Sequence, residues 1–163
     1  MSTFSLIQLS ENQLRDIAAA RVPMELAPRL EPEALPPDFV AARAISLLLE
    51  GHARIWCCTY LIIRDQDQRI VGSCGFKNAP KSGRVEIGYG VAPTAQGQGA
   101  ATAAARLLVR IAFEAGAREV LAEILPSNLA SQHVVQKAGF AEYGARFDED
   151  NEYVVQWLVQ KTA

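Results

Sequence analysis

The sequence predicts a protein of the α/β (α+β) class, in which a mixed β-sheet carries helices on both faces. Short segments rich in β-branched and aromatic residues alternate with helical segments along the chain. No repeat, low-complexity tract or second domain interrupts this alternation, and 163 residues suffice for one domain, 1–163, with a sizeable core.

The N-terminal half is expected to contain three strands and two helices, separated by a proline-rich loop that holds five of the eight prolines. In order, the expected elements are strand Thr3–Leu9, helix Glu11–Arg21, loop Val22–Asp38 with a short helical turn, helix Phe39–Glu50, strand Trp56–Ile63 and strand Ile70–Asn78. Ser10 and Asp38 can cap the two helices, and Gly51 ends the second. The last two strands form a hairpin around the turn 65–68.

The C-terminal half is expected to add three strands and two helices. In order, they are strand Val85–Val91, a helix from Gln98 to a stop at Gly116, strand 119–124, helix 129–138 and strand Glu152–Val159. Asn128 is a good N-cap for the second helix, and Gly139 is a good stop after it.

The most informative segment is the turn Gln96-Gly97-Gln98-Gly99-Ala100-Ala101 between a strand and an alanine-rich helix. Small residues at a helix N-terminus expose backbone N–H groups, so the turn is suited to a phosphate or pyrophosphate. A Walker loop is excluded because no lysine lies between Lys81 and Lys137. A dinucleotide fingerprint is excluded because Thr102 stands where its third glycine belongs.

This segment resembles motif A of the GCN5-related N-acetyltransferases, Gln/Arg-x-x-Gly-x-Gly/Ala, with Gln96, Gly99 and Ala101 at the defined positions. The next part of the family pattern follows at the expected distance: a strand ended by Pro126, then Asn128-x-x-Ser131, a helix and Gly-Phe. The resemblance covers roughly residues 55–159. It is closest to the branch typified by ribosomal-protein alanine acetyltransferases, which acts on protein N-termini, on small amines and on antibiotics.

The resemblance implies a mostly antiparallel sheet with a splay after the fourth strand. It also implies an acetyl-CoA-binding core over residues 83–140 and a variable acceptor-side loop and helix over residues 22–51. In the family, motif A wraps the pyrophosphate of acetyl-CoA, which is a co-substrate here, and the splayed strand and the following helix hold the pantetheine arm. The residues that this assigns to acetyl-CoA are Val91, Gln96, Gly97, Gln98, Gly99, Ala100, Ala101, Asn128 and Ser131.

Acetyl transfer to an amine needs a neutral nucleophile, a donor for the oxyanion and a way to release the thiol. Glu86 is the first candidate base and Glu123 the second, although Glu86 can equally be an ion-paired strand carboxylate. The N–H of Val91 is the expected oxyanion donor. The tyrosine that many relatives use as general acid is replaced by Val135. Ser131 is therefore the candidate acid, unless it only bonds a carbonyl within its helix.

The expected function is acetyl-CoA-dependent transfer of an acetyl group to a primary amine, either a protein N-terminus or a small molecule. The alternative is a catalytically inactive coenzyme A-binding or interaction protein of the same fold, and a nucleotide-binding regulatory domain is a more distant one. Acceptor specificity is expected in Val22–Gly51 and Tyr143–Tyr153, whose acidic residues can attract an amine.

Composition limits the partners and the compartment. A net charge of −2 without a basic block argues against nucleic acid, and no apolar run is long enough to span a membrane. Three cysteines without a disulfide framework fit a reduced cytoplasm. His52 and His133 stand alone, so no metal site is expected. The sequence leaves a homodimer open, because sheets of this class often pair at their edges.

Overall fold

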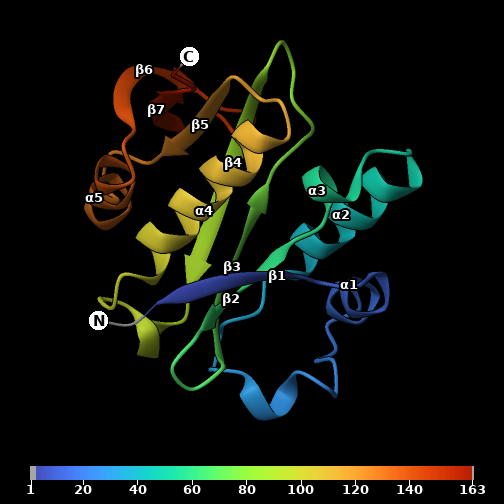
Figure 1. Cartoon of the computed structure of the whole chain (residues 1–163). Coiled ribbons are helices and arrows are strands. Elements are labelled where there is room, and N and C mark those ends of the chain that lie inside the picture. Colours follow the sequence, from blue (N-terminus) through green and yellow to red (C-terminus); the bar gives the residue numbers. More distant parts are fainter. Residues whose placement is uncertain (1–2, 163) are drawn as a thin grey trace.

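The computed structural model describes residues 3–162 and is built around a seven-stranded sheet (Figure 1). The strands are β1 (Phe4–Gln8), β2 (Tyr60–Arg64), β3 (Arg69–Phe76), β4 (Arg84–Val91), β5 (Glu119–Ile124), β6 (Ala141–Phe147) and β7 (Tyr153–Gln160). Their order across the sheet is β1-β2-β3-β4-β5-β7-β6. Neighbours are antiparallel except for β4 and β5, which are parallel. The predicted mixed, mostly antiparallel sheet is confirmed.

Helices cover both faces of the sheet, as predicted (Figure 1). They are α1 (Glu11–Ala18), α2 (Asp38–Leu49), α3 (Arg54–Cys57), α4 (Ala100–Glu114) and α5 (Leu129–Lys137), with single turns of 3-10 helix η1 (Ala27–Arg29) and η2 (Pro93–Ala95). Helix α4 packs across β1 to β5 and against α5, whereas α1 to α3 form a separate group that contacts the sheet through β3. Among the described residues, no helix has both the length and the apolar character needed to cross a membrane.

The core lies between these layers and is mostly aliphatic. Leu14 of α1, Ile62 of β2, Ile70 of β3 and Leu108 of α4 are fully buried in it. Burying an aliphatic side chain of this size stabilises the fold by about 1.5–3 kcal/mol. The three cysteines are buried and form no disulfide, in agreement with the sequence.

Most helix ends follow the predicted caps. Ser10 accepts a hydrogen bond from the N–H of Gln13 while the Gln13 side chain accepts from the N–H of Ser10, so α1 begins with a complete capping box. Gly51, Gly116 and Gly139 follow the C-termini of α2, α4 and α5 with φ of 90°, 102° and 96°. Only glycine adopts this left-handed conformation without strain, so it ends each helix as expected.

Several boundaries differ from the predictions, and three of these differences change the role of a named residue. Asp38 does not cap α2: it is the first helical residue, after Pro37, and no side chain caps this helix. Trp56 is not in a strand but in α3, where its ring packs edge-to-face against Phe76 with centroids 5.0 Å apart. Helix α1 ends at Ala18 instead of Arg21 because Ala20 has a positive φ of 60°.

Strand β6 was not predicted at all. Its residues were expected to be an acceptor-side region, but they pair with β7 and form the edge of the sheet. Every residue of β6 is exposed. The strand does alternate, because Ala141, Tyr143, Ala145 and Phe147 are separated by Glu142, Gly144 and Arg146, but this pattern was interpreted as part of the acceptor-side region.

The sheet divides at β4 and β5. Their parallel pairing covers three residue pairs, from Arg84 opposite Glu119 to Glu86 opposite Leu121. Beyond Glu86, β4 continues along β3 as far as Val91, while β5 continues along β7. The two strands separate there, which confirms the predicted splay.

One glycine allows the close approach of β3 and β4 beside this splay. Gly72 of β3 lies opposite Val91, and a Cβ at Gly72 would overlap the carbonyl oxygen of Gly90 and lie 3.0 Å from Val91 Cα. By contrast, a Cβ at Gly75 would meet nothing closer than 3.7 Å. Gly72 is therefore required where it stands, and Gly75 is not.

Candidate active site

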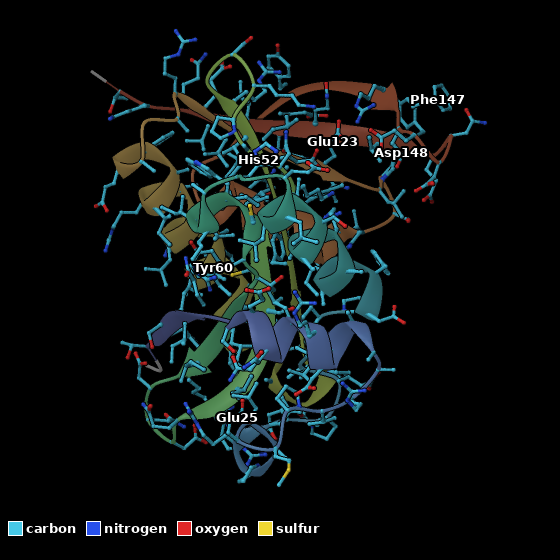
Figure 2. All side chains as sticks on the ribbon, turned by 90° about the vertical axis from the view of Figure 1, so that its right-hand side faces the viewer. Glu25, His52, Tyr60, Glu123, Phe147 and Asp148 are labelled. Atoms are coloured by element: carbon cyan, nitrogen blue, oxygen red, sulfur yellow. The ribbon has the colours of Figure 1, made fainter. Side chains whose placement is uncertain are left out.

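A cleft of about 780 Å³ opens where β4 and β5 separate. Its walls are formed by β3, β4, β5, the start of α5, the segment before α2 and the loop between β6 and β7. Figure 2 shows Glu123 and Asp148, two of its residues, toward the same end of the molecule, away from Glu25. The loop and helix of residues 22–51 and the β6–β7 region, both predicted to face the acceptor, contribute to this one cleft.

The edge of β4 that faces the cleft presents unpaired backbone groups. The carbonyl of Glu86 accepts a hydrogen bond from the N–H of Lys77, just after β3, at 2.8 Å, and the N–H of Ala92 donates one to Val71 of β3 at 2.8 Å. Because backbone groups of alternate residues in a strand face opposite edges, the N–H and carbonyl of Tyr89 and the N–H of Val91 point into the splay, beyond the last pair of β4 and β5. These groups can pair with an extended molecule in the way that another strand would.

The glycine turn lies at the end of this edge and begins α4. Gly97 and Gly99 have φ of 78° and 90°, and a Cβ at either position would point into open space. Gly99 is the N-cap of the 15-residue helix α4, whose first turn has no side-chain cap. The N–H groups that follow, in Ala100 and Ala101, are therefore available to an anion, and the helix dipole favours one there.

The two glutamines of the turn fix it to the sheet. Gln96 donates from Nε2 to the carbonyl of Val91 at 3.2 Å. Gln98 accepts from Arg64 Nη1 at 2.8 Å, and Arg64 in turn pairs with Asp67 at 2.8 Å. The turn is thus connected both to the end of β4 and to the β2–β3 hairpin.

This combination of a splayed strand pair, an open strand edge and a glycine turn at a helix N-terminus agrees with a family comparison. Residues 6–141 match the family described as acetyltransferase (GNAT) domain. The chain belongs to this family. The prediction of an N-acetyltransferase of the GCN5-related family is therefore confirmed, while no curated protein sequence matches the chain significantly.

Solved acetyltransferase structures share the fold along the whole chain. A ribosomal-protein-S5-alanine acetyltransferase from Vibrio fischeri has a TM-score of 0.67 at 16% identity and covers 98% of this chain and 96% of its own. RimJ from Mycobacterium smegmatis, solved with CoA-disulfide, has a TM-score of 0.68 at 18% identity and covers 96% and 81%. The aminoglycoside acetyltransferase AAC(6')-Ib, solved with coenzyme A, has a TM-score of 0.69 at 18% identity and covers 98% and 95%. The first two match the branch named from the sequence.

In this acetyltransferase, Glu86 lies at the point where β4 and β5 part. Its side chain is 19% exposed, and Oε2 lies 2.6 Å from Nζ of Lys77. The Lys77 side chain reaches it by passing over Gly88, where an added Cβ would lie 3.4 Å from Lys77 Cε. The first candidate base is therefore in the cleft and has a cationic partner there.

Glu123, the second candidate base, is held differently. Its side chain is 6% exposed, and both oxygens accept hydrogen bonds from Arg146, at 2.5 and 2.7 Å, with a third from Gln156 at 2.9 Å. Burial raises the pKa of Glu123, but the hydrogen bonds from Arg146 and Gln156 outweigh it and hold the pKa below its ordinary value. A carboxylate stabilised in this way is a weaker base, so Glu86 is the better candidate.

Ser131 also faces the cleft, from the first turn of α5. Its N–H donates to Asn128 Oδ1 at 3.1 Å, which confirms Asn128 as the N-cap. Its Oγ lies 2.6 Å from Oη of Tyr89 on β4, and Tyr89 also donates to the carbonyl of Ser131 at 3.2 Å. Val135, which was predicted to replace a tyrosine of the family, is fully buried.

Sequence reasoning missed Tyr89. Burial raises the pKa of Tyr89 above its ordinary value, and the hydrogen bond with Ser131 offsets part of this rise. The phenol therefore keeps its proton at neutral pH and can donate it. Tyr89 could have been chosen from the sequence, because it lies in β4 at the expected splay. Its contact with α5, however, depends on the tertiary fold.

The remaining predicted positions divide between the cleft and the turn. Glu86, Val91, Asn128 and Ser131 line the cleft together, whereas the turn residues 96–101 lie beyond its end. Acidic residues gather on the acceptor side of the cleft: Glu33, Asp148, Glu149 and Asp150.

Three carboxyl groups, two of them exposed, come close to one another at the turn between β6 and β7. Carboxylate oxygens of Asp148, Asp150 and Glu152 lie within 4.8 Å of each other. Asp148 Oδ1 accepts the N–H groups of Asp150 and Glu152, so the turn between β6 and β7 by itself accounts for their proximity.

Proposed function

We propose that this acetyltransferase moves an acetyl group from acetyl-CoA to the primary amine of a peptide N-terminus or of a small molecule. One observation carries the proposal. The splay between β4 and β5 brings an acidic side chain, an open strand edge and a pair of hydroxyl groups into one cleft, at the end of which the glycine turn begins α4.

The residues present fit acetyl-CoA, which would supply an activated acyl group as a thioester. The turn from Gly97 to Ala101 would hold the pyrophosphate, because it offers helix N-terminal N–H groups with no side chain in front of them. The open backbone groups of Tyr89 would pair with pantetheine amides, the N–H of Val91 would face the thioester, and Asn128 would contact the arm from the other side. This assigns residues 83–140 as the acetyl-CoA-binding core.

Three side chains and one backbone group would then carry the chemistry. Glu86 would accept the proton of the acceptor ammonium, and the N–H of Val91 would donate to the carbonyl oxygen as negative charge develops on it. Ser131, hydrogen-bonded to Tyr89, would give a proton to the sulfur as the carbon–sulfur bond breaks. The pair can act as the acid in place of the tyrosine that Val135 replaces.

The acceptor is expected to be cationic. Six carboxylates and three cationic side chains line the cleft: Glu33, Glu86, Glu123, Asp148, Glu149 and Asp150 against Arg43, Lys77 and Arg146. A cleft with this excess raises the local concentration of positively charged substrates. Structural relatives named for a ribosomal-protein alanine, for spermidine and for an aminoglycoside define the first panel to screen.

Titration calorimetry with acetyl-CoA tests the proposal. The wild-type protein should bind, and Gly99→Glu should abolish binding because it places a negative charge where the pyrophosphate would lie. Gly116→Glu is the matched control: Gly116 is also left-handed, also faces open space, and stands at the other end of α4. Failure of the wild-type protein to bind would refute the proposal. Binding without transfer to any amine of the panel would favour a catalytically inactive coenzyme A-binding protein.

A further inference from the structure

The amine of Lys77 lies beside Glu86, where the proposed function places the amine of the acceptor. Lys77 follows the last residue of β3, lines the cleft, and its side chain is 41% exposed. Its Nζ lies 2.6 Å from the Oε2 of Glu86, the carboxylate to which the proposed function assigns the acceptor proton. An amine of the chain itself is therefore already in contact with the candidate base.

Gly88 leaves room for the Lys77 side chain along β4. The stem of Lys77 lies over Gly88, whose missing side chain leaves the surface of β4 clear at that point. Tyr89, whose backbone groups face the splay, is three residues from Glu86, or about 10 Å along a strand. The flexible four-carbon stem of a lysine can cover part of this distance by rotation alone.

The other three lysines of the chain have no such position. None of Lys81, Lys137 and Lys161 lines the cleft, and Lys161 donates to the carbonyl of Phe113 at 3.2 Å. They provide an internal reference for the reactivity of an ordinary surface lysine toward acetyl-CoA.

We propose that Lys77 is an internal acetyl acceptor, so that the protein acetylates its own cleft. This inference rests on the proposed function. Glu86 takes a proton from the Lys77 ammonium, and Nζ then forms a bond to the acetyl carbon of acetyl-CoA. The carbon–sulfur bond breaks, and the departing sulfur takes a proton from the Ser131–Tyr89 pair. As Nζ becomes an amide nitrogen it loses a second proton, which returns through solvent to that pair. The products are Nζ-acetyl-Lys77, coenzyme A and protonated Glu86, which releases its proton to solvent.

The modification changes the charge of the cleft. An acetylated Lys77 is neutral, so three cationic side chains become two against the same six carboxylates. Glu86 also loses its ion-pair partner and becomes available to an external amine. Self-acetylation therefore prepares the cleft for a cationic acceptor, by removing the cation that competes with it for Glu86.

Mass spectrometry of the purified protein incubated with acetyl-CoA tests the inference. We expect one acetyl group, mapped to Lys77, at a rate independent of protein concentration and far above the rates at Lys81, Lys137 and Lys161. Glu86→Gln should slow this modification by about 10²-fold or more, as expected for loss of a general base. Lys77→Arg, which keeps the charge but not the nucleophile, should abolish it.

A second readout does not depend on transfer. Acetic anhydride, used without acetyl-CoA, labels accessible lysines, and saturating coenzyme A should slow labelling of Lys77 while leaving Lys81 and Lys161 unchanged. Lack of protection would show that Lys77 lies away from the bound thiol and would overturn the inference.

The two proposals fail in distinguishable ways. If the protein acetylates external amines but leaves Lys77 unmodified, or modifies it no faster than Lys81, the inference is wrong and the proposed function stands. If calorimetry shows no acetyl-CoA binding at all, both are wrong.

Discussion

Replacing Gly72 by alanine should damage both the stability of the fold and the edge of β4. The new Cβ would overlap the carbonyl oxygen of Gly90 and lie 3.0 Å from Val91 Cα and 3.2 Å from Gly90 C. All three atoms belong to the backbone, so no side-chain rotation relieves the overlap. The end of β4 must move away from β3, and with it the N–H of Val91 that the proposed function assigns to the oxyanion.

The size of the effect follows from overpacking. Inserting one methyl group into a closely packed site typically costs about 1–3 kcal/mol. For a chain of 150–250 residues each kcal/mol lowers Tm by about 2–4 °C, so the expected decrease is about 2–12 °C. If the movement also weakens one hydrogen bond to acetyl-CoA, worth about 0.5–1.5 kcal/mol, Kd rises by about 2- to 10-fold.

Thermal unfolding followed by circular dichroism, together with titration calorimetry, measures both effects. Gly75→Ala is the matched control on the same strand, because its Cβ would make contacts of 3.7 Å with Cys58 and Thr59. Gly75→Ala should therefore leave stability unchanged or raise it slightly, by about 0.4–1 kcal/mol through the unfolded chain. The reasoning is refuted if Gly72→Ala has the same Tm as the wild type, or if Gly72→Ala and Gly75→Ala lower Tm equally.

Three further predictions concern the acid pair, a buried carboxylate and a helix cap. Tyr89→Phe and Ser131→Ala should each lower kcat more than they weaken acetyl-CoA binding. In steady-state kinetics the kcat of the double variant should be little lower than that of either single variant, and additive losses would show that the two hydroxyl groups do not act as a pair. Because the pKa of Glu123 is lowered on folding, its stabilising contribution is present above the unfolded value and lost as the pH falls through the folded one. Urea unfolding from pH 7 to 3 should thus show a smaller acid-induced loss in Glu123→Gln, and an unchanged loss would contradict this. Ser10→Ala should cost about 1 kcal/mol in urea unfolding, and an unchanged midpoint would mean that the capping box adds nothing.

The elements that the sequence predicts well are those whose signals are local. Asn128 and Ser10 cap helices through residues two or three positions away, and Gly116 and Gly139 end helices through their own backbone conformation. Strand 119–124 was predicted with its observed bounds, because aliphatic residues dominate it and Pro126 prevents it from continuing. The splay came from the family resemblance, not from such signals.

The errors have two different causes. Trp56 is of a residue type common in strands, but packing against Phe76, twenty residues later, places it in a helical turn. The residues of β6 alternate between apolar and polar types as in a strand, but all of them are exposed, and the strand is identified by its pairing with β7. The first error comes from a contact between distant segments, and the second from a local pattern that was not used.

The candidate site follows the same division. Glu86, the glycine turn and Asn128 could be located from the sequence because a short motif specifies them. The partners that decide their chemistry could not: Lys77 beside Glu86, Arg146 around Glu123 and Tyr89 on Ser131 all come from other elements. Choosing Glu86 over Glu123 as the base requires those contacts.

The short pairing between β4 and β5 has a mechanical consequence. Three residue pairs connect the backbone ladder of β1–β4 to that of β5–β7, with α4 packed against both sides. A molecule bound along the open edge of β4 would act as a brace across this seam. Binding of that molecule should therefore slow amide hydrogen exchange in β5 and β7, although these strands lie away from the turn that would hold its phosphates. Without a bound molecule, we expect the sheet to separate first between β4 and β5 when the protein is heated or stretched.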